Sequence, residues 1–187
     1  VWSMNGAFSG VRVIEVGGLE TLYAGKLLAD QGAEVLLVEP EHGHVSRRLP
    51  PYAADKLDDV ASVPFAYFNG NKRSVCLPLG RSDGVDGLRR LLGDADVVLA
   101  GGRPADLKEL GISPEAVVRY APRAVLVTVT PFGWTGPWAD LYADDLVVQA
   151  LGGLMSLGGY ADGRPLRPPA GQAYVGAGLF AAVGVAA

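Results

Sequence analysis

The first residues that could do chemistry form a glycine turn near the amino terminus. Gly17-Gly18-Leu19-Glu20-Thr21 follows a short β-rich stretch, and Glu39 closes the next apolar run. A dinucleotide-binding turn needs G-x-G-x-x-G and an acidic residue about 20 positions on. Glu39 meets the second requirement, but the glycine pattern fails, and Glu20 would repel a pyrophosphate at the helix start. We therefore interpret this segment as a tight strand-to-helix turn with a solvated glutamate.

Two basic pairs and one acidic pair are the other candidates. Arg47-Arg48 and Lys72-Arg73 could bind an anion or form ordinary surface ion pairs. Asp144-Asp145 precede an apolar stretch, where carboxylates suit the amino-terminal end of a helix as caps. The pattern favours capping for the acidic pair and leaves both roles open for the basic ones.

Composition excludes several kinds of site. A formal net charge of -4 argues against a protein built around nucleic-acid binding, which usually needs a basic face. One cysteine, Cys76, and two histidines exclude a disulfide framework and the usual zinc sites, so we expect no metal. No apolar run is long enough to span a membrane, and residues 1–10 lack the pattern of a signal peptide. We therefore expect a cytoplasmic setting without membrane contact.

The elements that must position these residues alternate between strand and helix. Apolar runs predict strands at 11–16, 35–38, 74–79, 96–99 and 124–129. Helical periodicity predicts helices at 19–27 with a stop at Gly32, at 85–92, from Ser113, at 145–157 and at 175–186, with a loop at 158–171. Alternating strands and helices predict a Rossmann-like α/β domain: a doubly wound, mostly parallel sheet with helices on both faces.

Several stretches in a fixed order carry a family resemblance. They are 27–35 (LLADQGAEV), 38–40 (VEP), 43–47, 68–75 (FNGNKRSV), 95–98, 110–111, 132–137 (FGWTGP) and 145–155. Together they resemble the class III CoA-transferases, the family of formyl-CoA transferase, carnitine CoA-transferase and the methylacyl-CoA racemases. The resemblance implies that residues 1–187 are the amino-terminal part of the large domain, with the small domain and the carboxyl-terminal segment outside this chain. The chain also stops inside an apolar helix, and we expect residues 175–187 to pack against further chain or a partner.

The resemblance implies a chemistry and its substrates. Members of the family move CoA from an acyl-CoA to a free carboxylic acid and form interlocked dimers. An aspartate attacks the thioester, which gives a mixed anhydride and then an aspartyl-CoA thioester. Acyl-CoA or CoA and a second CoA-transferase-like domain are therefore the expected partners.

The position of that aspartate is the main departure from the family. In the family it lies four residues before a glycine that Gly178 matches here, and counting back reaches Tyr174. No Asp or Glu occurs between Arg164 and Ala187. A phenol with a pKa of about 10 stays protonated at neutral pH, whereas a carboxylate at a helix start would stay ionised. The sequence therefore predicts a chain without its own nucleophile, with Tyr174 as a packing residue.

Other differences from the family sequence reduce the binding of CoA that we expect. Glu20-Thr21-Leu22, Ala100-Gly101-Gly102 and Glu109 replace the family's usual residues. The positions that the resemblance still assigns to CoA are Arg47, Lys72, Arg73 and Leu110. It also implies that Asp145 lies near the active site. Asp144 stands where the racemase branch has a histidine, so the His-Asp pair of that branch is not reproduced.

Three hypotheses from different classes remain. The chain is an inactive half or subunit of a CoA-transferase whose second family domain supplies the aspartate. Alternatively, it belongs to an active acyl-CoA transferase or lyase with a changed mechanism. In the third hypothesis it is a non-catalytic CoA-ester binding or structural subunit. The sequence leaves open whether this protein is an enzyme in its own right.

Overall fold

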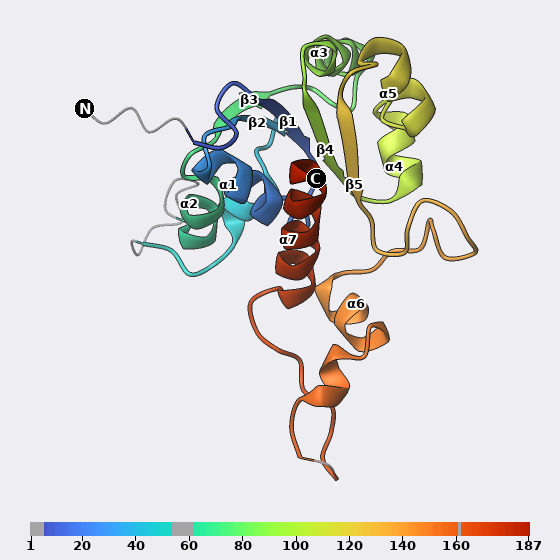
Figure 1. Cartoon of the computed structure of the whole chain (residues 1–187). Helices are drawn as coiled ribbons and strands as arrows, with labels where there is room; N and C mark the ends of the chain where they lie inside the picture. Colours follow the sequence, from blue (N-terminus) through green and yellow to red (C-terminus); the bar gives the residue numbers. More distant parts are fainter. Residues whose placement is uncertain (1–5, 54–61, 161) are drawn as a thin grey trace.

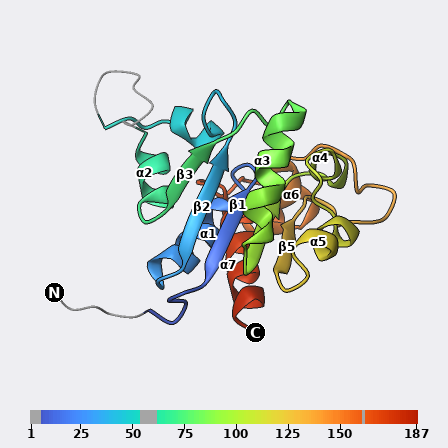
Figure 2. The ribbon, with the colours of Figure 1, turned by 90° about the horizontal axis from the view of Figure 1, so that it is seen from above.

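A five-stranded parallel sheet forms the centre of the molecule (Figures 1 and 2). The structure is a computed structural model that describes residues 6–53, 62–160 and 162–187. Across the sheet the strands run in the order β3-β2-β1-β4-β5, and every neighbouring pair is parallel. The strands are β1 (Arg12–Val16), β2 (Glu34–Glu39), β3 (Arg73–Cys76), β4 (Val97–Gly101) and β5 (Val125–Val129). The predicted parallel α/β fold is confirmed.

Helices cover both faces of the sheet. They are α1 (Leu22–Asp30), α2 (Val63–Asn69), α3 (Ser82–Gly93), α4 (Pro104–Glu109), α5 (Pro114–Tyr120), α6 (Asp145–Leu151) and α7 (Gln172–Ala186), with 3₁₀ turns η1 (Val45–Arg48) and η2 (Leu154–Leu157). In Figure 1, α1 and α7 lie on one face and α3, α4 and α5 on the other. Successive strand residues point to opposite faces, so Val13 joins the core with Leu28 of α1, and Ile14 joins the core with Leu88 of α3.

The strand order reverses between β1 and β4, which places a crevice at their carboxyl ends. β1 continues to β2 and β3 on one side, whereas β4 and β5 lie on the other. The backbones meet closely at this point: a Cβ at Gly17 would lie 2.8 Å from the backbone nitrogen of Gly101. Glycine at position 17 therefore lets the first turn approach the end of β4.

Two predicted elements end earlier in the structure, and two short helices were not predicted. β3 ends at Cys76 rather than 79, because Pro78 has no N–H for the ladder. The helix predicted at 145–157 stops at Leu151; Gly153 is left-handed (φ 79°), and η2 follows as a separate turn. The short helices α2 and α4 were not predicted at all. Neither runs longer than two turns, so their periodicity is weak.

The predicted helix ends and caps agree better with the structure. α1 stops at Asp30, and Gly32 is left-handed (φ 99°) as a stop residue should be. Ser113 caps α5 by accepting a hydrogen bond from the Ala116 N–H at 3.1 Å.

Candidate functional site

Glu20 lies in the turn between β1 and α1, and its carboxylate is held over the end of β4. The Gly18 N–H donates to Glu20 Oε1 at 3.0 Å. A Cβ at Gly101 would collide with Oε1, and one at Gly18 would lie 2.7 Å from Oε2, so the carboxylate occupies space left by two glycines. Our interpretation of Glu20 as a solvated residue is wrong in this respect. The side chain is partly buried and lines a cavity together with Tyr174.

Tyr174 and Asp145 join the starts of α7 and α6 through two reciprocal hydrogen bonds. The Asp145 backbone N–H donates to the Tyr174 hydroxyl at 3.0 Å. In return, Asp145 Oδ1 accepts the Ala173 N–H from the first turn of α7 at 2.9 Å. The structure therefore brings together the two residues that the sequence singled out as near-site positions.

The Asp145 carboxylate has donors on both oxygens. Besides the Ala173 N–H on Oδ1, Oδ2 accepts Gln149 Nε2 at 2.5 Å and Arg167 Nη2 at 3.0 Å. The residue is 3% exposed. A carboxylate held by this many hydrogen bonds is a poor nucleophile, because attack would require its oxygens to give some of them up.

The acidic pair 144–145 caps two different helices. Asp144 is the N-cap of α6 and accepts the Val147 N–H at 3.1 Å, which confirms the predicted cap. Asp145 instead serves the amino-terminal end of α7. The sequence could not show this second role, because α7 starts far along the chain from residue 145.

Burial raises the pKa of the Tyr174 phenol above its ordinary value. The hydrogen bond from the Asp145 N–H opposes this shift, but Glu20, Asp144 and Asp145 add to it because negative charge nearby disfavours a phenolate. Tyr174 is therefore a neutral phenol at physiological pH. Its role as a packing residue, rather than as a base or nucleophile, stays a prediction.

Three cavities meet at Tyr174. The largest, about 820 Å³, lies between α1, α2 and the start of α7; Leu22, Tyr23, Phe68 and Val175 are among its apolar walls. A second of about 220 Å³ lies over the ends of β4 and β5 and contains Glu20 and Arg103. A third, of about 470 Å³, lies beside the start of α6. Tyr174 thus occupies the junction between an apolar cavity and two more polar ones.

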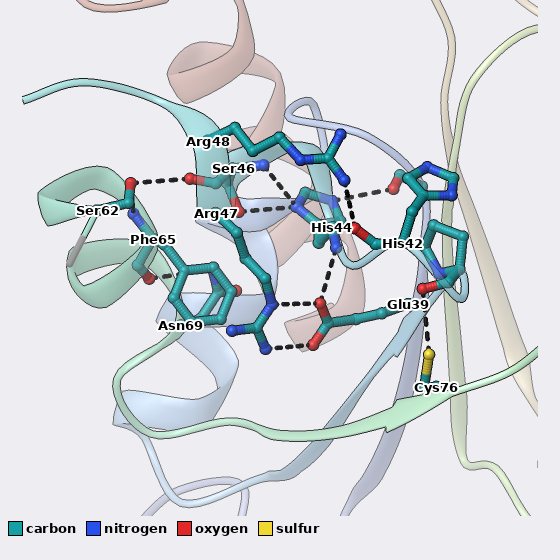
Figure 3. Close-up of polar contacts among 12 residues, drawn as sticks. Glu39, His42, His44, Ser46, Arg47, Arg48, Ser62, Phe65, Asn69 and Cys76 are labelled. Atoms are coloured by element: carbon teal, nitrogen blue, oxygen red, sulfur yellow. Dashed lines mark hydrogen bonds and ion pairs between the residues drawn. The ribbon is translucent and has the colours of Figure 1, made fainter. Parts of the chain in front are cut away.

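Arg47 and Glu39 form a two-pronged ion pair beside β2 (Figure 3). Arg47 Nε and Nη2 donate to the two Glu39 oxygens at 2.6 and 2.7 Å, and the guanidinium lies 3.9 Å from the centre of the Phe65 ring. Burial alone would raise the pKa of Glu39, but the bonds from Arg47 and the His44 N–H outweigh it and lower the pKa to about 2. Arg47 also lines a cavity of about 440 Å³ with His42 and Cys76.

His44 ties the loop after β2 to the first turn. The Ser46 N–H donates to Nδ1 at 3.1 Å, so the proton belongs on Nε2, which lies 3.1 Å from the Gly17 carbonyl oxygen. Burial lowers the pKa of His44, which keeps this neutral form. The glycine turn and the loop that carries Arg47 are therefore held in one arrangement.

The other positions that the resemblance assigned to CoA have different surroundings. The Lys72 side chain is 1% exposed; its Nζ lies 2.7 Å from Glu15 Oε2 and donates to the Leu22 carbonyl at 3.0 Å. Arg73 forms an exposed pair with Glu34 at 3.0 Å, and the exposed Arg48 donates to the His42 carbonyl. Leu110 packs against the core under α4. In this arrangement the Lys72 ammonium faces inward, away from any phosphate in solvent.

Sequence reasoning missed Glu15 and Arg167. Glu15 is fully buried in β1, where it accepts Thr21 Oγ1 at 3.0 Å and pairs with Lys72. The sequence could have identified Glu15, because a lone glutamate in a strand buried on both faces needs a cationic partner. Arg167 offered no comparable signal, since it lies in a loop rich in Gly and Pro.

The described part of the chain shows neither a membrane-spanning helix nor a metal-binding cluster. Residues 6–53, 62–160 and 162–187 contain no helix long and apolar enough to cross a membrane. The same residues show no group of three or more His, Cys, Asp or Glu side chains placed to hold a metal ion.

Three proteins with similar sequences are all named as CoA-transferases. A subunit of succinyl-CoA:(R)-benzylsuccinate CoA-transferase from Thauera aromatica is 38% identical over 179 residues, covering 96% of this chain and 44% of the relative. Succinate–glutarate CoA-transferase of Agrobacterium fabrum is 35% identical, covering 92% of this chain and 44% of the relative. A probable CoA-transferase of Mycobacterium tuberculosis is 39% identical and covers 84% of this chain but 19% of the relative. The chain spans less than half the length of these relatives.

Solved structures and a family model lead to the same assignment. A CAIB/BAIF family protein from Brucella suis superposes with a TM-score of 0.88 at 28% identity, covering 97% of this chain and 48% of that protein. The model of CoA-transferase family III matches residues 8–187. With the parallel sheet and the crevice at β1 and β4, these matches show that the chain belongs to CoA-transferase family III.

Proposed function

We propose that this chain is the amino-terminal part of a CoA-transferase half or subunit that lacks its own nucleophile and works with a second family domain that supplies it. The complete assembly would exchange CoA between an acyl-CoA and a carboxylic acid. In this proposal the present chain contributes to assembly and to binding of the CoA thioester.

The proposal depends above all on the side chain at position 174. This position corresponds to the aspartate of the family, and it holds a neutral, partly buried phenol whose hydroxyl accepts the Asp145 N–H. A nucleophile for a thioester needs a lowered pKa or an adjacent base. The described contacts of the Tyr174 hydroxyl include no side-chain base, so this residue lacks both.

Asp145 is not a suitable replacement for the missing aspartate. Three hydrogen bonds hold its two oxygens, and one of them comes from the Arg167 guanidinium. Attack on a thioester would require the carboxylate to give up bonds that hold the start of α7, Gln149 and Arg167 in place. This argues against an active enzyme with a changed mechanism that uses the nearest carboxylate of this chain.

Two relatives favour a divided assembly. One carries the word "subunit" in its name, which implies a second component in that enzyme. The other is about twice as long as the rest, because this chain covers 19% of it against 44% of the others. A relative that is twice as long as the others has room for two family domains, one with the nucleophile and one without it.

The large cavity supports a remaining role in binding a thioester. Its volume of about 820 Å³ and mostly apolar walls suit the flexible arm and acyl group of an acyl-CoA. Of the four positions assigned to CoA, Arg47 is the one best placed to approach a phosphate, because its guanidinium lines a cavity of about 440 Å³. Arg73 and Leu110 stay weaker candidates, and Lys72 acts here through Glu15 and Leu22.

The test is mass spectrometry of the full-length protein with its partner domain or subunit. We expect incubation with acyl-CoA, followed by hydroxylamine or borohydride trapping, to label a carboxylate of the partner and no residue of this chain. Tyr174→Phe removes only the hydroxyl and is expected to leave transferase activity within about twofold of the wild type. The Asp145 N–H loses one acceptor in that variant, so a thermal scan should accompany the assay.

The result that would overturn the proposal is an adduct mapped to Tyr174 or Asp145. Loss of activity in Tyr174→Phe with an unchanged thermal midpoint would have the same meaning. Leu157→Ala, on the exposed turn η2, is a control for nonspecific effects of substitution in this part of the chain.

A further inference from the structure

Among the described residues, Arg167 is the one cationic side chain that lines the large cavity of about 820 Å³. It comes from the loop between η2 and α7, and 49% of its side chain is exposed. Within the described part of the chain its guanidinium makes one hydrogen bond, from Nη2 to Asp145 Oδ2 at 3.0 Å. A guanidinium has five N–H donors, so most of the donors of Arg167 can still bind another acceptor.

Asp145 does not use up the positive charge of Arg167. Its oxygens also accept the Ala173 N–H at 2.9 Å and Gln149 Nε2 at 2.5 Å, so its negative charge is shared among three donors. The Asp145 side chain is 4% exposed, whereas that of Arg167 is 49% exposed. An anion that enters the cavity therefore meets the guanidinium before the carboxylate. The planar guanidinium can bind it along a free edge and keep its bond to Asp145.

Three aromatic rings line the same cavity, and we call Tyr23, Tyr67 and Phe68 its aromatic wall. The ring of Phe68 packs edge to face against the other two, with centroids 6.4 Å from Tyr23 and 5.0 Å from Tyr67. Leu22 and Val175 add aliphatic surface. Rings favour edge-to-face or offset contacts with a further ring, so this wall suits an aromatic group. The cavity thus combines an aromatic wall with one accessible positive charge.

We propose that the large cavity binds a free carboxylic acid with an apolar, aromatic body. The Arg167 guanidinium binds the carboxylate, and the aromatic wall contacts the ring of the acid. Arg167 and Phe68 are then specificity-determining residues, the first for the charge and the second for the ring. The inference deepens the proposed function, on which it rests for the use of a carboxylic acid, because that function leaves the kind of acid open.

Calorimetric titration of the full-length protein with its partner, without CoA, tests the inference with phenylacetate as the probe. Phenylacetamide lacks the charge and acetate lacks the ring, and we expect each to bind about tenfold more weakly than phenylacetate. Arg167→Gln removes the positive charge, so its affinity for phenylacetate should fall about tenfold, to that of the amide. Phe68→Leu keeps an apolar side chain and should reduce the preference for phenylacetate over hexanoate about threefold.

The matched control is Arg164→Gln, at another exposed arginine of the same loop, which should bind phenylacetate as the wild type does. If Arg167→Gln lowers the thermal midpoint, Arg167→Lys retains the charge and should recover part of the affinity. No binding of phenylacetate by the wild type would overturn the inference, as would equal affinities of wild type and a folded Arg167→Gln variant. The titration contains no CoA, so it can fail while acyl-CoA still labels the partner, and it can succeed where that labelling fails.

Discussion

Lys72 and Arg47 show how differently two basic residues with the same expected ligand can be used. Lys72 is a point charge in the core, where Glu15 and a single backbone carbonyl are its partners. Arg47 lies beside β2 with 21% of its side chain exposed, and it grips both oxygens of Glu39. Burial raises the pKa of Glu15, whereas the pKa of Glu39 falls to about 2.

The number of hydrogen-bond donors and the access of water therefore decide how much an ion pair contributes to stability. Glu39 has three donors and a partly hydrated partner, so its ionised form is strongly favoured. Glu15 must overcome a desolvation cost that one ammonium and one hydroxyl offset. A buried pair of this kind is costly to break and adds little to stability beyond holding its neighbours in place.

The largest effect is expected from Lys72→Met. It leaves the Glu15 carboxylate buried without a cation and frees the Leu22 carbonyl, so the free energy of unfolding should fall by about 3–5 kcal/mol. Chemical denaturation of the full-length protein measures this. Adding Glu15→Gln should recover most of the loss, because the neutral amide can still accept from Thr21. A loss below about 1 kcal/mol in Lys72→Met would contradict the buried-pair interpretation.

A smaller, pH-dependent effect is expected from Arg47→Ala. Because the pKa of Glu39 is lowered to about 2 in the folded protein, its contribution is present above the unfolded pKa of about 4.5 and is lost as pH falls toward 2. At pH 7 the variant should lose about 1–2 kcal/mol of unfolding free energy after allowance for solvent screening. The difference from wild type should vanish near pH 2.

The control for that measurement is Arg48→Ala, since this neighbouring side chain is exposed and bonds only to a carbonyl among its described contacts. We expect its unfolding free energy to stay within about 0.5 kcal/mol of wild type at every pH. A constant difference between Arg47→Ala and wild type from pH 7 to 2 would count against the charge-assisted bond to Glu39.

The smallest effect is expected from Arg73→Ala. Arg73 and Glu34 are 76% and 54% exposed, so water screens their attraction. The free energy of unfolding should change by less than about 0.5 kcal/mol, and by less still in 0.5 M salt. A loss comparable to that of Arg47→Ala would show that exposure does not rank these three pairs.

The sheet and most of the helices were predicted correctly from the sequence, which also predicts that Tyr174 stands where the family has its aspartate. Buried strands appear in the sequence as continuous apolar runs. Gly32 marks the end of one helix through its left-handed backbone, and Ser113 marks the start of another through its cap; both are local properties. The identity of residue 174 is also a local fact once the family pattern fixes the register. Short helices such as α2 and α4 were not predicted, because two turns contain too few residues to show a helical hydrophobic period.

Only the tertiary structure decided which side chains meet. The sequence suggests a surface cation at Lys72, yet in the fold its side chain reaches Glu15 of β1 in the core, two strands away from β3. Asp145 reads as a cap for its own helix, yet it serves α7, whose first turn lies 28 residues further along the chain. Glu20 turns inward because Gly101, from a distant strand, leaves room for it. Such contacts depend on how the elements pack, and a linear pattern carries no record of that packing.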